Sequence, residues 1–205
     1  MSHPLEAEYS DAYGFTPLHF ASLRGAPVDL IKSLIDEFPE ACVQRNKYGK
    51  LPLHLCCKCT DLSSVHTLYG LLFSVNRLRS TVFICETLEK KTPLEILCHW
   101  NSRTIQEVLN EPSPKQQRHL AWDEQFRVFW IKACMLLHAA THTEAPASDP
   151  TLVDVWQLED AFEQKVVHAC VATLCHPLVR CPSCLFLLAV RLYPDQLIKL
   201  FCARA

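Results

Sequence analysis

The stretch from Cys175 to Cys184 holds the residue types best suited to chemistry in this chain. Thiolate and imidazole groups are ligands that zinc prefers, and Cys181 and Cys184 have the spacing of one ligand pair. One pair is only half of a four-ligand site, so we expect no bound metal. A zinc-stabilised binding module that uses the Cys175–Cys184 region is the alternative. Its other two ligands would be Cys175 or His176, together with His168 or Cys170.

The same two cysteines also fit a redox motif. Cys181-Pro182-Ser183-Cys184 resembles the motif of thioredoxin-like proteins, in which a helix N-terminus lowers the pKa of the thiol and makes it reactive. That chemistry occurs beside a βαβ pattern, which is not found near these residues. We therefore favour a structural interpretation, with Pro182 in the first turn of a helix and Cys184 packed inward as a small apolar residue. A thiol oxidoreductase is the less favoured alternative.

Three histidines could act as ligands or bases, but their positions indicate a structural role. His19, His54 and His168 occupy similar places in similar short motifs. A position that recurs in a repeat is set by geometry rather than by a single active site. The sequence also lacks a Gly-x-Ser-x-Gly nucleophile motif. We therefore expect no catalytic residue and no cofactor.

A second cysteine cluster, made of Cys56, Cys57 and Cys59, is expected to pack in the core. On a helix Cys56 and Cys59 would share a face while Cys57 points elsewhere. The three thiols therefore cannot converge on one site without distortion. The N-terminal segment has neither the basic nor the apolar region of a secretory signal. We therefore expect reduced thiols and a cytoplasmic or nuclear protein.

An internal repeat predicts the elements that position these residues. The sequence Asp-Ala-Tyr-Gly-Phe-Thr-Pro-Leu-His at 11–19 recurs 35 residues later as Asn-Lys-Tyr-Gly-Lys-Leu-Pro-Leu-His at 46–54, and a weaker copy begins near Leu88. The glycine suits a turn with positive φ, the threonine suits an N-cap, and the proline suits the first helical position. Because Leu51 replaces the threonine in the second copy, we expect a weaker helix start there.

Each copy predicts a polar turn and a short helix, followed by a second segment whose apolar residues have helical spacing. A helix–turn–helix unit of this kind cannot bury its apolar face alone, so the units are expected to stack. The β-branched and aromatic segment Thr81–Cys85 predicts an extended hairpin inserted before the third copy. The second helices are expected within 28–35, 62–72 and 105–109. Phe38-Pro39 ends the first of them.

The second half of the chain predicts further helices with a less regular pattern. Apolar residues between Trp122 and Leu137 fall on one face of a long helix. A loop rich in Ala, Pro, Ser and Thr is expected at 141–150, and another helix at 155–174. We interpret the C-terminal part as a degenerate repeat.

These patterns divide the chain into three parts. Repeats occupy 1–110, a linker with an amphipathic helix and a loop occupies 111–150, and a degenerate helical repeat occupies 151–205. A solenoid needs a polar terminal cap, and the apolar tail at 197–205 does not supply one. We expect this tail to fold back on the last helix or to mediate self-association.

Composition narrows the class of partner. The net charge is −2 and the pI is near 6.5. There is no excess of positive charge to release counterions from a nucleic-acid backbone, so we expect no nucleic-acid partner. The most apolar stretch, 184–190, stops at Arg191 and is too short to span a membrane, so we expect no membrane partner either. Another protein is the expected partner.

The repeated motif resembles the ankyrin repeat. Its Gly-x-Thr-Pro-Leu-His core, with an acidic or amide residue three places before the glycine, is complete at Asp11–His19 and lacks only the threonine at Asn46–His54. The third copy keeps Thr92-Pro93-Leu94 but has Lys90 for the glycine and Glu95 for the histidine. The Leu-Pro-Leu-His start is similar to that of a divergent ankyrin group.

The resemblance implies an all-α fold, an ankyrin-like helix-turn-helix solenoid with a helical C-terminal region. It also implies a protein–protein interaction adaptor or scaffold without catalytic activity. In ankyrin repeat proteins the turn tips and the exposed side of the short helices meet the partner. The partner-binding residues implied here are Tyr13, Phe15, Arg24, Tyr48, Lys50 and Lys58, with Ser22 and Leu23 beside them.

Overall fold

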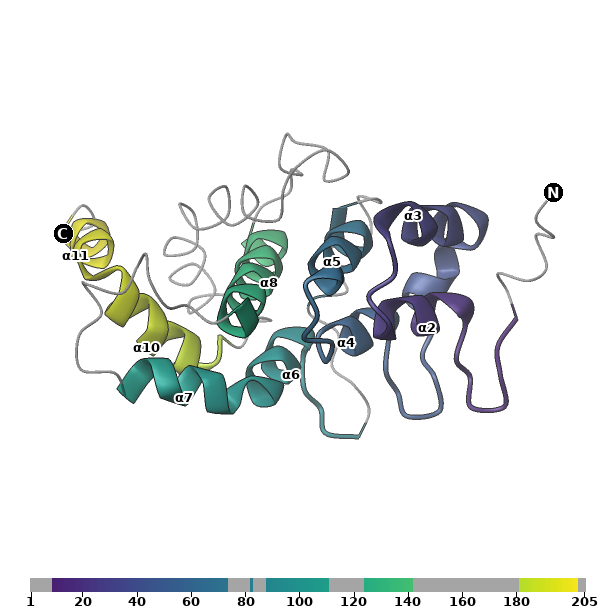
Figure 1. Ribbon diagram of the computed structural model, residues 1–205, viewed down its shortest axis with the longest axis horizontal. Helices are drawn as coiled ribbons and strands as arrows, with labels where there is room; N and C mark the ends of the chain where they lie inside the picture. The colour runs from purple at the N-terminus through teal and green to yellow at the C-terminus, as the bar shows by residue number, and fades with distance from the viewer. Residues whose placement is uncertain (1–8, 74–81, 83–87, 111–123, 142–180, 203–205) are drawn as a thin grey trace.

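The computed structural model describes residues 9–73, 82, 88–110, 124–141 and 181–202, and the regular structure within these ranges is helical throughout. This confirms the expected all-α class. Figure 1 shows the helices from α2 to α8 in two rows, with connecting turns that project below the lower row, and α10 running obliquely towards α11. The helices are α2 (Pro17–Leu23), α3 (Val28–Glu37), η1 (Pro39–Cys42), α4 (Pro52–Cys56), α5 (Ser63–Phe73), α6 (Pro93–Trp100), α7 (Ser102–Asn110), α8 (Glu124–Thr141), α10 (Ser183–Leu192) and α11 (Pro194–Cys202).

Local sequence explains where the short helices begin. The hydroxyl oxygens of Thr16 and Thr92 accept hydrogen bonds from the backbone N–H groups of His19 and Glu95, both at 3.3 Å. A proline follows each threonine at the first helical position, as expected. Leu51 has no side-chain oxygen to offer, and α4, which follows it, is only five residues long. This agrees with the weaker helix start expected at that position.

The first two helix pairs pack as two layers. The short helices α2, α4 and α6 lie side by side in the lower row, and α3, α5 and α8 lie side by side in the upper row (Figure 1). Gly70 lets α5 approach α3 closely, because a Cβ there would lie 3.0 Å from Ile31 and 3.1 Å from Val28. Nearby, the Thr67 hydroxyl donates to the Ala26 carbonyl at 2.7 Å. The first two helix pairs therefore pack against each other.

The third unit departs from the expected arrangement. Helix α7 forms where the sequence predicts it, but the neighbour of α5 in the upper row is α8, which also contacts α6. Helix α7 instead continues from α6 after one residue, Asn101, whose side-chain amide donates to the Leu97 carbonyl at 2.9 Å. Within α7, Ile105 is the one buried residue. Such a narrow apolar face cannot cover both α5 and α6, whereas the large side chains of α8 can.

Helix α8 is buried on nearly all sides, so the prediction of a single apolar face is wrong for it. Phe126, Phe129 and Trp130 are almost inaccessible, and every residue from 128 to 139 is buried. Helix α8 contacts α5, α6 and α7, and its Trp130 ring stacks on Tyr193. The helix is therefore a central part of the core rather than a surface helix in a linker.

One hydrophobic core runs through the described helices, from α2 to α11. The predicted boundary at residue 110 lies within this core, since α8 packs on α5 and α6. The ring of Trp130 also stacks on Tyr193, with ring centroids 6.2 Å apart, and so joins α8 to the C-terminal helices. The described segments on both sides of residue 110 thus share one core.

The C-terminal helices follow part of the sequence prediction. Helix α10 begins at Ser183, so Pro182 is its N-cap rather than a residue of its first turn. Helix α11 packs on α10 and buries Leu197, as the fold-back prediction requires, while Ile198 remains 61% exposed. Self-association through this end of the chain stays a prediction.

Other predictions fall outside the described residues. These are the loop at 141–150, apart from Thr141, which belongs to α8 instead, the helix at 155–174, the motif at His168, and Trp122 on the long helix. Of the predicted hairpin at 81–85, the structure describes Val82, which is buried. Among the described residues, no helix combines the length and apolar character needed to cross a membrane.

Candidate functional site

The first two turns share one bracing arrangement. The Asp11 carboxylate accepts hydrogen bonds from the backbone N–H groups of Tyr13 and Phe15, at 2.9 and 2.8 Å. The Asn46 side-chain oxygen accepts from the N–H groups of Tyr48 and Lys50, both at 3.0 Å. The glycine of each motif has positive φ, 77° in the first turn and 71° in the second. Each turn therefore holds its tip residues in one backbone conformation.

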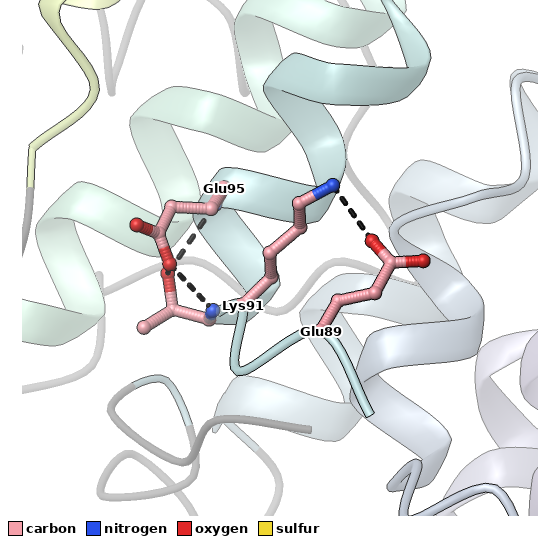
Figure 2. Close-up of polar contacts among 4 residues, drawn as sticks. Glu89, Lys91 and Glu95 are labelled. Carbon is pink, nitrogen blue, oxygen red and sulfur yellow. Dashed lines mark hydrogen bonds and ion pairs between the residues drawn. The ribbon is translucent and has the colours of Figure 1, made fainter. Parts of the chain in front are cut away.

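The third turn keeps this conformation without glycine. Lys90 has a φ of 54°, in the left-handed region that an L-residue with a Cβ seldom adopts. Figure 2 shows the ion pair beside it, in which Lys91 Nζ lies 2.7 Å from Glu89 Oε2. Glu95 replaces the motif histidine and accepts a hydrogen bond from the Thr92 N–H at 2.8 Å. Together with the Thr92 hydroxyl this completes a capping box.

His19 links the first turn to the second. Its Nδ1 accepts the Thr16 N–H at 3.1 Å, so the ring proton must lie on Nε2, which donates to the Lys50 carbonyl at 3.0 Å. The ring is fully buried. His54, equally buried, repeats the first contact by accepting the Leu51 N–H at 3.0 Å. The predicted structural role is confirmed for both histidines.

Four aromatic side chains at the first two turns form what we name the tip cluster: Tyr13, Phe15, Phe20 and Tyr48. Tyr13 stacks on Tyr48 with ring centroids 6.4 Å apart, and Phe15 lies 5.3 Å from Phe20 and 6.2 Å from Tyr48. Tyr13 is 57% exposed, Phe20 47% and Tyr48 44%. These residues therefore contact each other across the repeat and still present ring surface to solvent.

Backbone contacts fix the two tips relative to each other. The Lys47 N–H donates to the Tyr13 carbonyl at 2.9 Å, and the His19 ring holds the Lys50 carbonyl. A partner would therefore meet an aromatic surface that is already ordered, which reduces the entropy lost on binding.

The remaining predicted contact residues differ in how far they are exposed. Arg24 and Leu23 are exposed at the end of α2, and Lys50 is half-buried beside the tip cluster. Lys58 lies with its Nζ 5.1 Å from the centre of the Trp100 ring. The prediction that Ser22 is on the surface is wrong, because Ser22 is fully buried and its hydroxyl donates to the Leu18 carbonyl at 2.7 Å.

Sequence reasoning missed Phe20 and Trp100. The signal for Phe20 was available, since Leu18, His19 and Ser22 define the buried side of α2 and Phe20 lies away from it. Trp100 ends α6 and is 56% exposed, and its contact with Lys58 joins residues 42 positions apart. A contact over that separation depends on the tertiary fold and leaves no local pattern.

Cys56 and Cys57 are core residues, as expected, whereas Cys59 is half-buried and is not part of the core. Helix α4 ends at Cys56 and so does not carry Cys57 or Cys59. Cys56 and Cys57 are both fully buried, and burial raises the pKa of the Cys56 thiol to about 11. The buried Lys132 of α8 donates to the carbonyls of Cys56 and Cys59, at 3.0 and 2.7 Å. It thereby satisfies carbonyls at the C-terminal end of α4.

The candidates for metal or redox chemistry lie partly outside the described residues. Cys175, His176, His168 and Cys170 are outside, whereas Cys181 and Cys184 are inside and half-buried. Within the described ranges no three potential ligands come together as a metal site. The interaction with Cys98 of α6 lowers the pKa of the Cys184 thiol to about 7, against the opposing effect of partial burial.

Comparison of the chain with protein-family models, with curated proteins and with solved structures finds no match.

Proposed function

We propose that this chain is a protein–protein interaction adaptor or scaffold without catalysis of its own, and that it binds its partner through the tip cluster. The observation that carries the proposal is the ordered, solvent-exposed group of aromatic rings at the first two turns. Tyrosine is enriched among the residues that dominate binding energy at protein interfaces. Exposed aromatic residues that gather in one place commonly mark an interaction site.

The arrangement of the helices supports an ankyrin-like solenoid as the scaffold for this surface. Two consecutive helix pairs stack on each other, and three turns share a left-handed residue at the same place in the motif. In a stack of this type each unit contacts its neighbours, and the turns line up along one edge. The tip cluster spans two such turns, so its geometry depends on the stacking.

The charges around the tip cluster suggest what the partner presents. Lys47 is exposed and Lys50 is half-buried on the second turn, and Arg24 and Lys58 follow the C-terminal ends of α2 and α4. A partner segment with an apolar side chain for the aromatic rings and carboxylates beside it would complement this surface. The cytoplasmic or nuclear location expected from the sequence stays a prediction.

The test is an affinity pull-down from native lysate with three baits. These are the wild-type chain, a tip variant with Tyr13→Ala, Tyr48→Ala and Lys50→Ala, and a control variant with Leu30→Ala and Ile198→Ala. The control removes exposed apolar side chains from α3 and α11, away from the turns. Melting temperatures of all three baits check that they fold.

A protein bound by the wild type and the control but lost from the tip variant would support the proposal. Its purified form should bind the tip variant at least about tenfold more weakly, which corresponds to about 1.4 kcal/mol. If a folded tip variant recovers the same proteins as the wild type, the tip cluster is not the binding surface.

A further inference from the structure

The outward side of α11 carries a short row of exposed residues, which we name the α11 stripe. It consists of Asp195, Ile198, Lys199 and Cys202, and Ile198 is 61% exposed. Residues three, four and seven positions apart share one side of a helix, and this side lies opposite the buried Leu197. The α11 stripe therefore places an exposed apolar side chain beside one negative and one positive charge.

The two charges of the α11 stripe are not used within the part of the chain that the structure describes. Asp195 and Lys199 lie four residues apart, but neither takes part in an ion pair or a side-chain hydrogen bond there. Asp195 lies in the first turn of α11 and Lys199 in the last, which is the order that the helix dipole favours. Both charges are therefore held on an ordered helix and are available to a partner.

The order of these residues makes the α11 stripe complementary to a second copy of itself. When two identical helices pack antiparallel about a twofold axis at Ile198, the two Ile198 side chains meet at that axis. Asp195 of one copy then lies about one helical turn from Lys199 of the second copy, and the axis repeats this pair. In a parallel arrangement each charge would face its own like charge, so the charges select the antiparallel pair.

We propose that α11 is a homodimerisation helix, whose stripe packs antiparallel on the α11 stripe of a second copy of this chain. The inner side of α11 packs on α10 and buries Leu197, so folding back and self-association use different residues of the same helix. The helix has nine residues and is about 14 Å long, so the interface is smaller than those of permanent dimers. The dimer is therefore reversible, with a dissociation constant of about 1 to 100 µM.

The position of α11 gives this dimer a consequence for binding. Figure 1 shows α11 at one end of the described helices and α2 and α3 at the other. The tip cluster belongs to the turns beside α2 and α4, so dimerisation through α11 leaves both copies of the cluster uncovered. Two linked surfaces hold a bivalent partner more tightly than one surface does. This last step rests on the proposed function, whereas the dimer itself does not.

Sedimentation velocity of the full chain, at concentrations from about 1 to 200 µM, tests the dimer. The chain mass is 23.4 kDa, and the proposal expects a concentration-dependent shift towards twice that mass. Asp195→Lys and Lys199→Asp should each raise the dissociation constant at least about tenfold, because each places like charges against each other across the axis. A double variant with both changes should restore the dimer, since it recreates the opposite-charge pairs in reverse.

Melting temperatures of these variants check that they fold. A wild-type chain that stays monomeric over the whole range would overturn the proposal. So would folded single variants that dimerise as the wild type does, or a folded double variant that does not recover. The pull-down control carries Ile198→Ala, which should weaken the dimer, so a partner that it retains binds the tip cluster of a single copy. Sedimentation does not depend on that partner, so the two proposals fail separately.

A cysteine at the centre of the stripe tests the packing arrangement. In Ile198→Cys the two introduced thiols would lie at the axis, where their Cβ atoms can approach to the roughly 4 Å that a disulfide needs. Trypsin releases position 198 in the peptide 192–199, which has no cysteine in the wild type, so two such peptides joined by a disulfide come from two chains. The matched control is Leu30→Cys on α3, because Leu30 is also exposed and its peptide 25–32 likewise has no cysteine.

After mild oxidation and alkylation of the remaining thiols, mass spectrometry should find joined 192–199 peptides in Ile198→Cys. The 25–32 peptides of Leu30→Cys should stay unlinked under the same conditions. Equal linkage in the two variants, or no linkage in Ile198→Cys at a concentration where the wild type is dimeric, would overturn the assignment of the dimer to the α11 stripe.

Discussion

At the scale of single residues, the buried polar side chains of the repeat motif have the structural roles that the motif predicts. In the first repeat motif Thr16 and His19 form a hydrogen bond with each other. His19 also binds the Lys50 carbonyl and so fixes the first turn relative to the second. The histidine roles could be predicted because they follow from a local motif that recurs. The Lys58–Trp100 contact could not, because it joins residues far apart in the sequence and depends on how the chain packs.

The burial of His19 predicts a pH-dependent stability. Burial lowers the pKa of His19 below its ordinary 6.5, although the hydrogen bond to the Lys50 carbonyl and the nearby Asp11 act in the opposite direction. The unfolded chain therefore binds this proton more readily than the folded protein. The stabilisation is complete above pH 6.5 and is lost as the pH falls from about 6.5 towards the lower pKa of the folded state.

Urea unfolding between pH 5 and pH 8 measures this effect. The free energy of unfolding of the wild type should fall below pH 6.5 more steeply than that of His19→Gln, which keeps a donor for the Lys50 carbonyl but does not titrate. His99→Gln is the control, because His99 is exposed. Equal slopes for the wild type and His19→Gln would show that His19 does not contribute.

At the scale of elements, the turns and short helices follow closely from the sequence, since each depends on a few adjacent residues. The N-cap residue, the proline and the left-handed residue lie within a few adjacent positions, so α2, α4 and α6 begin where predicted. Helix α8 was predicted as a helix but not as one that is buried on nearly all sides. Its contacts with α5, α6 and α7 join segments that are far apart in the sequence, so no periodicity within α8 can reveal them.

Lys90 gives a prediction at the scale of the turn. Because its φ is 54°, Lys90→Gly should relieve the cost of a left-handed conformation and raise the free energy of unfolding by about 1 kcal/mol. Gly49, at the same place in the second turn with a φ of 71°, is the matched control. Gly49→Ala should change stability in the opposite direction by at least about 1 kcal/mol. Chemical denaturation of both variants checks this, and the same sign for both would contradict it.

At the scale of the whole molecule, the upper row of helices is completed by a segment from beyond the recognisable repeats. Helix α8 occupies the place next to α5, and the Trp130–Tyr193 stack connects it to the C-terminal helices. The repeat motif predicts that units stack. It does not predict which helix follows α5, because that choice depends on how much apolar surface α7 and α8 each offer.

Removal of α8 should therefore disable the repeats themselves. A fragment of residues 1–110 keeps all three motif copies but leaves the sides of α5 and α6 that contact α8 uncovered. We expect it to lose the cooperative thermal transition of the full chain, monitored by circular dichroism, and to bind a hydrophobic dye. A fragment that melts cooperatively at the temperature of the full chain would show that the three repeats are stable without α8.

The position of α8 also bears on how the protein is made. A nascent chain leaves the ribosome from its N-terminus, and incomplete folding units expose apolar surface during synthesis. Helices α5 and α6 are finished at residue 100, but the helix that covers them ends at Thr141. Over the intervening part of translation those surfaces have no native cover, which makes this stage the one at which the growing chain most needs a chaperone.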